Sequence, residues 1–188
     1  MSLRTTSFWD VIRTPEPPEL GPGPRRHVLP LSVLTGRFEA WAATANLETA
    51  AAIHLRATAY LHHDHSDAAH DLVQDLPDPD GALIHGTLHR REPDYWNAKY
   101  WFRQAENHPV YRCMASRLRD QPAATAFASL IERLTLTGNL DPLALVDAIE
   151  AVAHRPESDA EVNFLRAVQL IETECLVAHL LSGTALAR

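Results

Sequence analysis

From residue 32 to the end of the chain, the apolar residues follow the spacing of helices. They recur three and four residues apart, and no run shows the strict alternation of a half-buried strand. Segments 81–91 and 122–136 are two of the expected helices, the first capped by Asp80 and the second with Pro122 near its first turn. The pattern therefore predicts an all-α protein, a compact bundle of about eight helices.

The first 30 residues differ in composition from the rest. Six prolines lie between positions 15 and 30, where they remove backbone donors and disfavour helix. We expect residues 1–30 to form an extended Pro-rich arm, attached to a single all-α domain of residues 31–188. Two arrangements are open: the arm packs on its own domain, or it reaches a second subunit and forms a homodimer.

Charge and cysteine content exclude several classes of protein. The formal net charge of −7 argues against a nucleic-acid partner, which needs a basic face. The apolar segments are interrupted by charges well before the ~20 residues that span a bilayer, so no membrane partner is expected. Cys113 and Cys175 lie far apart without a CxxC motif, and the N-terminus lacks the apolar stretch of a signal peptide. We therefore expect a cytoplasmic protein rather than a disulfide-stapled secreted one.

Two stretches share one spacing of small and aromatic residues. Relative to the first position, members follow at +3, +12, +16 and +19, and the two frames are 29 residues apart. The frames consist of Ala57, Tyr60, Ala69, Val73 and Leu76, and of Gly86, His89, Ala98, Phe102 and Ala105. This spacing resembles the tetratricopeptide repeat, although the usual period is about 34 residues. The resemblance covers about residues 50–106 and implies two helical hairpins, which the flanking helices would have to cap.

The stretch HGTLHRREPDYWNAKYWF, which belongs to the second frame, is also similar to a signature of uncharacterised bacterial proteins. That resemblance implies no activity, because the function of those proteins is unknown.

Histidines occupy positions of this register that a repeat usually fills with apolar residues. His85 and His89 are four residues apart and share one helix face, and His70 lies on the preceding helix. A site of His70, His85, His89 and a carboxylate, Asp94 or Glu92, predicts a divalent metal such as zinc, nickel or iron. The catalytic glutamate of an HExxH motif is absent, because position 86 is glycine. The alternative is a packing network in which both imidazoles are hydrogen-bonded within the protein.

The surface around these histidines is the expected binding site. Its candidate ligand-binding residues are His85, His89, Arg90, Asp94, Asn97, Tyr100, Trp101 and Arg103. The leading hypothesis is a binding module for a small anionic ligand or a protein segment, with the arginines holding the anion. The alternatives are a small, metal-assisted enzyme that uses His85 and His89, and a structural or oligomerisation module.

A second group of histidines lies in one turn, His62-His63-Asp64-His65, which we call the HHDH turn. Polar residues in succession between two helices are typical of a solvated loop. We therefore expect the HHDH turn to be exposed and to have no specific role.

Overall fold

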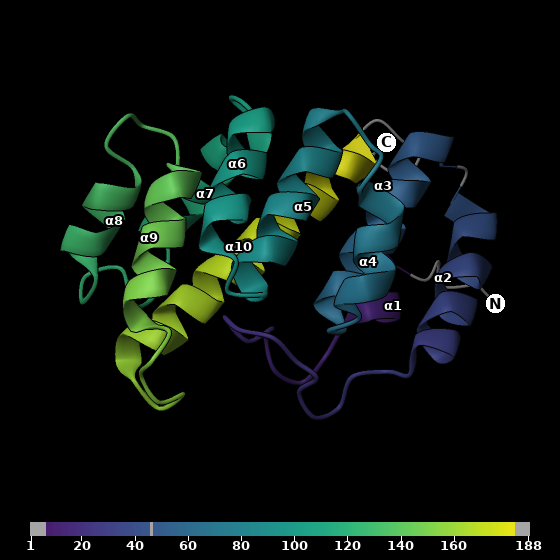
Figure 1. The fold of residues 1–188 in the computed structure, drawn as a ribbon, viewed down its shortest axis with the longest axis horizontal. Coiled ribbons are helices and arrows are strands. Elements are labelled where there is room, and N and C mark those ends of the chain that lie inside the picture. Colours follow the sequence, from purple (N-terminus) through teal and green to yellow (C-terminus); the bar gives the residue numbers. More distant parts are fainter. Residues whose placement is uncertain (1–6, 46, 183–188) are drawn as a thin grey trace, which may run out of the picture.

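The computed structural model describes residues 7–45 and 47–182, and within these ranges it contains ten helices and no strand (Figure 1). The all-α prediction is thus confirmed. The helices are α1 (Phe8–Ile12), α2 (Leu31–Ala45), α3 (Thr49–His62), α4 (Ser66–Val73), α5 (Pro79–Arg91), α6 (Tyr95–Gln104), α7 (Pro109–Arg119), α8 (Ala128–Leu134), α9 (Pro142–Val152) and α10 (Ala160–Ser182). Ten helices replace the expected eight or so, and one of them, α1, belongs to the arm.

The longest helix, α10, passes behind a row of shorter helices that stand side by side (Figure 1). It contacts α3, α7 and α9, and its buried face of mostly apolar residues forms one side of the core. In front of it, α3 packs on α4, α5 packs on α6, and α4 lies against α5. The three histidines of the predicted site therefore come from two helices that are in contact.

The prediction of a helix over 122–136 is wrong in its first half. Residues 122–127 form turns, and α8 begins only at Ala128. Phe127 directly before it stacks on Phe164 of α10, with ring centroids 4.4 Å apart. This aromatic contact holds the residue before α8 against another helix, and Pro122 restricts the backbone of the preceding turns.

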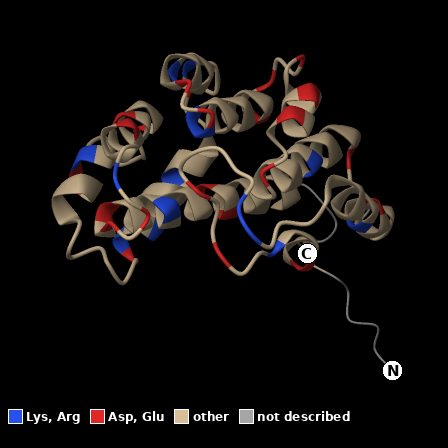
Figure 2. Cartoon of the chain, turned by 60° about the horizontal axis from the view of Figure 1, so that its bottom comes forward, with Lys and Arg blue, Asp and Glu red and all other residues tan. Residues whose placement is uncertain are grey.

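The arm packs on its own domain in the part that the structure describes. Its short helix α1 places Phe8, Val11 and Ile12 in the core. The carbonyl oxygens that follow accept hydrogen bonds from the helices: that of Pro17 from Arg166 of α10, and that of Glu19 from Gln169. Figure 2 turns the arm toward the viewer and shows acidic and basic residues along it.

The HHDH turn is buried rather than solvated, so the prediction for it is wrong. The carboxylate of Asp64 is inaccessible to solvent and pairs with the guanidinium groups of Arg25, from the arm, and Arg91, from α5. The ring of His63 is also buried and bonds the backbone of the arm. The turn is polar because it binds the arm, and the sequence pattern alone does not distinguish this role from solvation.

The two cysteines form a disulfide, which contradicts the expectation that the chain has no such link. Cys113 of α7 and Cys175 of α10 are 62 residues apart in sequence, but these helices pack together and bring their Cα atoms to 5.9 Å. The expectation of a reducing compartment rested on unpaired cysteines and loses that support. No helix among the described residues is long and apolar enough to cross a membrane.

Candidate metal-binding site

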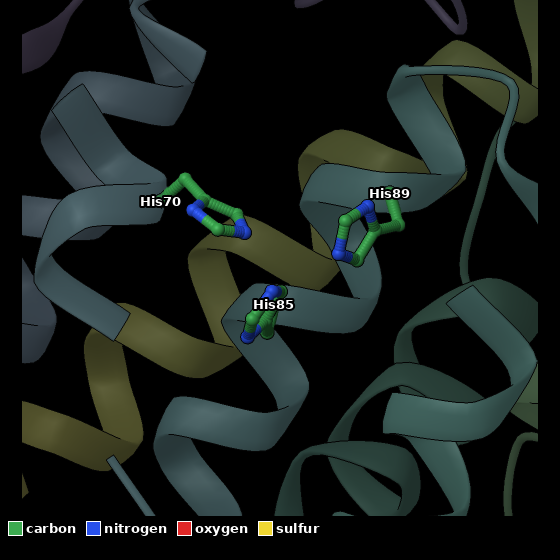
Figure 3. A group of neighbouring side chains, drawn as sticks. All are labelled: His70, His85 and His89. Carbon is green, nitrogen blue, oxygen red and sulfur yellow. The ribbon is translucent and has the colours of Figure 1, made fainter. Parts of the chain in front are cut away.

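His70, His85 and His89 converge where α4 faces α5 (Figure 3). The His70 ring lies edge-on to both others, with centroids 4.7 Å from His85 and 5.7 Å from His89. The rings of His85 and His89 are 4.7 Å apart, as expected for side chains one turn apart on a helix face. One nitrogen from each ring lies within 4.8 Å of the other two. The structure thus brings together the three predicted histidines.

Hydrogen bonds fix the protonation of His89. Its Nδ1 lies 3.1 Å from a carboxylate oxygen of Glu92, which can only accept, so Nδ1 carries the proton. Its Nε2 lies 3.1 Å from the amide nitrogen of Asn97, which donates, so Nε2 presents a lone pair. Metal-binding histidines are commonly oriented in this way: one ring nitrogen donates its N–H to a carboxylate, and the other presents its lone pair to the metal.

His85 is the most constrained ring of the three. It stacks on the indole of Trp101 with centroids 3.9 Å apart and planes 14° apart, and the residue is 3% exposed. Its Nδ1 is buried and has no hydrogen-bond partner among the described residues. A buried polar nitrogen typically needs a bonding partner worth about 1–3 kcal/mol, so Nδ1 of His85 is available to bind a ligand.

Burial keeps two members of this cluster, His85 and His89, neutral near neutral pH. Burial, reinforced by the neighbouring His89 and His70, lowers the pKa of His85 to about 4. Burial also lowers the pKa of His89, although the carboxylate of Glu92 opposes that shift. A neutral imidazole is the form that binds a metal, so no proton has to be displaced at these two positions.

The geometry of the cluster fits a transition-metal ion. Nitrogen ligands lie at ~2.0–2.1 Å from zinc, and three nitrogens 4.8 Å apart reach that distance if each moves inward by roughly 0.7 Å. Rotation of an imidazole about its side-chain torsions covers such a shift. Nitrogen-only sites of this type suit zinc, nickel, copper and iron. The cluster can therefore supply three ligands and leave further coordination positions to other groups.

The other predicted site residues do not all join the histidines. Asp94 caps α6 by accepting from the backbone of Asn97, and the group that could hold a metal at this place contains the three histidines without it. The side chain of Arg90 extends toward α10, where its fully buried guanidinium donates to Glu172. It is therefore not on the surface where we expected it to bind an anion. Tyr100 and Arg103 are exposed on α6, and Tyr100 contacts Trp101 edge to face.

Glu92, one of the two carboxylates considered from the sequence as a metal ligand, instead contacts Nδ1 of His89. The spacing of three residues between them was a usable signal, because such pairs meet on a helix face. The partners of Arg90, Glu172 and Gln169, lie about eighty residues away and gave no local signal. A comparison of the chain with protein-family models, with curated proteins and with solved structures finds no match.

Proposed function

We propose that this protein binds a divalent transition-metal ion through His70, His85 and His89. The observation that carries the proposal is the convergence of three imidazoles from two helices, one of which, His89, presents a lone pair while Glu92 holds its other nitrogen. The unpartnered Nδ1 of His85 supports it, because a buried ring without a partner gains from rotating toward an ion.

Metal binding also provides the positive charge that an anionic ligand needs. Of the two candidate arginines, Arg90 is buried and paired with Glu172, whereas Arg103 is exposed on α6 and remains to assist the ion. Three neutral imidazoles leave the full charge of a divalent ion uncompensated, so a carboxylate, a phosphate or hydroxide would bind at its open positions. The function that we propose is therefore binding of a small anion at a histidine-held metal.

Hydrolysis is a second candidate, favoured by the position of Asn97. The Asn97 amide now donates to Nε2 of His89, and it would lie beside an ion bound at that nitrogen. It could then donate a hydrogen bond to a group on the open side of the ion. Such an ion, held by His70, His85 and His89, would supply the activation of water that hydrolysis requires.

The proposal is tested by the metal content and cobalt binding of the full-length chain, purified without a histidine tag. We expect about one zinc per chain, and a cobalt-substituted protein with visible absorption bands. His85→Ala or His89→Ala should abolish binding at that stoichiometry. Glu92→Gln, which keeps the three ligands and removes only the orienting charge, should weaken binding by about 10–100-fold.

An exposed histidine provides the matched control. His154, which lies just beyond α9, is exposed, and His154→Ala should bind metal as the unchanged chain does. Because His85 is buried, its variant can lose stability, whereas His70 is only half-buried and His70→Ala tests the same site with less risk. Binding that survives both His70→Ala and Glu92→Gln unchanged, or no binding to the unchanged chain, contradicts the proposal and leaves a packing network.

A further inference from the structure

A second cluster of ionisable side chains lies where α5 and α7 begin, next to the end of α10. Five residues from four segments meet there, and sequence reasoning assigned none of them to a site: His54, Asp78, Asp80, His108 and His179. In Figure 1 the yellow end of α10 reaches the level of α3 and α5, and α10 and α3 are in contact. The cluster is separate from His70, His85 and His89, with which it shares no residue.

Asp80 is held by two imidazoles. Its Oδ1 accepts from Nε2 of His108 at 2.8 Å and lies 3.1 Å from Nε2 of His179. Burial raises the pKa of Asp80, but the His108 hydrogen bond and the nearby imidazoles outweigh it, so the pKa lies below its usual value. Asp80 is therefore a carboxylate at neutral pH, in a position that two neighbours restrict.

His108 acts on Asp80 and is not itself available to a metal. Its Nδ1 accepts a hydrogen bond from the backbone N–H of Val110, so the ring proton is on Nε2, the atom that donates to Asp80. To bind a metal through Nε2, the ring would have to lose this proton or give up its role as the N-cap of α7. His108 thus orients the carboxylate of Asp80 by a hydrogen bond, as the hydrogen-bond partners of metal ligands do in known metal sites.

His54 and Asp78 complete a group with donor atoms available. The His54 residue is 3% exposed, and its Nε2 lies 3.0 Å from Asp78 Oδ1 without a hydrogen bond of proper geometry. Asp78, and not Asp80 as the sequence predicts, caps α5, and its Oδ1 accepts from the backbone N–H of Gly81. One donor atom from each of His54, Asp78 and Asp80 lies within 4.8 Å of the other two.

This group opens on a cavity. The cavity has a volume of about 420 Å³, and Glu48 and His179 line it together with His54, Asp78 and Asp80. Three carboxylates around one cavity favour a cation, and a buried imidazole nitrogen without a satisfactory partner points to one that accepts a nitrogen ligand.

We propose that His54, Asp78 and Asp80 form a second cation site, for a divalent metal of the manganese or iron(II) type, with the remaining coordination positions facing the cavity. One imidazole and two carboxylates make a harder set of ligands than three imidazoles, and carboxylate oxygens suit manganese. His179, which borders both Asp80 and the cavity, is placed to add a ligand from the open side. The chain then carries two metal sites of different preference, and α5 contributes ligands to both.

Manganese is the probe that tests this site, because electron paramagnetic resonance distinguishes free from bound Mn²⁺. We expect the full chain to bind one Mn²⁺, and Asp80→Asn and His54→Gln each to weaken binding at least about tenfold. Asp78→Asn should also weaken Mn²⁺ binding at least about tenfold. It should still cap α5, because asparagine caps a helix as well as aspartate does. His70→Ala, which removes a ligand of the first cluster at a half-buried position, should bind Mn²⁺ as the unchanged chain does.

Asp141 is a matched control for Asp78, since both cap a helix whose first residue is proline. Asp141→Asn should leave Mn²⁺ binding unchanged. The proposal is overturned if the chain binds no Mn²⁺, if Asp78→Asn and Asp80→Asn both bind it normally, or if His70→Ala loses it. The last outcome would place the ion at the first cluster, so failure of the two proposals can be distinguished.

Discussion

Among the described residues, Arg90 is the largest side chain that the fold buries completely, and it links α5 to α10. Both terminal nitrogens of its guanidinium donate to Glu172, one of them also to Gln169, and its Cζ atom lies 5.5 Å from the ring centroid of Phe102. Thr87 also donates to Glu172. The charge is thus neutralised inside the core, and neither residue is available for a ligand at the surface.

Breaking this pair from one side should be more damaging than removing it. Arg90→Met leaves Glu172 buried without its counter-ion and should lower the free energy of unfolding by about 3–5 kcal/mol. The double variant Arg90→Met/Glu172→Met should recover most of that loss, because neither charge then remains buried. Urea unfolding measures both.

An exposed pair gives the comparison for this prediction. Lys99 contacts Asp147, which is 64% exposed, and Lys99→Met should change the free energy of unfolding by less than about 1 kcal/mol. An Arg90→Met variant as stable as Lys99→Met would contradict the account of Arg90 given above.

Helices α5 and α6 come together at a glycine. A Cβ added to Gly86 would lie 2.9 Å from Cδ1 of Phe102, closer than side chains approach each other, and Phe102 is 1% exposed. Gly86 and Phe102 both belong to the second repeat-like frame, and in the structure the ring of Phe102 packs on Gly86. Whether the frames are tetratricopeptide-like remains a proposal, which this contact supports.

Two glycine-to-alanine variants should therefore have opposite effects. Gly86→Ala removes a flexible residue from a helix but forces Phe102 to move, and overpacking of this kind typically costs about 1–3 kcal/mol. Gly36, which lies in α2, is exposed and has no atom near its added Cβ, so Gly36→Ala should stabilise by about 0.5–1 kcal/mol. Thermal unfolding distinguishes the two, and a stabilised Gly86→Ala would show that the helices have room to separate.

How much the sequence could predict depends on how far apart the contacting residues are along the chain. His85 and His89 lie on one helix, and His70 on the helix before it, so periodicity was enough to bring them together. The cluster of His54, Asp80 and His179 draws on helices up to 125 positions apart, and no spacing signals it. The same holds for the disulfide between α7 and α10, because it depends on which helices pack together.

In the molecule as a whole, two uncharged histidines of the HHDH turn, His62 and His63, contact the N-terminal arm. His63 accepts from the backbone N–H of Leu29 and donates to the carbonyl of Ile12, so a second proton on the ring would break the first bond. Nε2 of His62 contacts Thr14, and its Nδ1 is buried without a partner among the described residues. Burial, together with the charge of Arg25, lowers the pKa of His62 to about 3, and burial lowers that of His63 to about 4.

These two rings should make the stability of the protein depend on pH. The ordinary histidine value is 6.5, so between that pH and the folded values the unfolded chain binds more protons than the folded one. The free energy of unfolding should be greatest above pH 6.5 and fall as the pH is lowered, by up to about 1.4 kcal/mol per pH unit for each histidine. Urea unfolding followed by circular dichroism, at several values between about pH 7.5 and 5, measures the slope.

Comparison of variants assigns that slope to the arm. His62→Gln/His63→Gln should have a shallower dependence on pH, since two groups that titrate on unfolding are gone, whereas the exposed His154→Gln should leave the slope unchanged. The dependence that remains in the double variant comes in part from His85, whose pKa burial lowers to about 4. If the unchanged chain is equally stable at both ends of the pH range, or if the double variant keeps the full slope, the arm is held by its other contacts, chiefly Arg25 with Asp64.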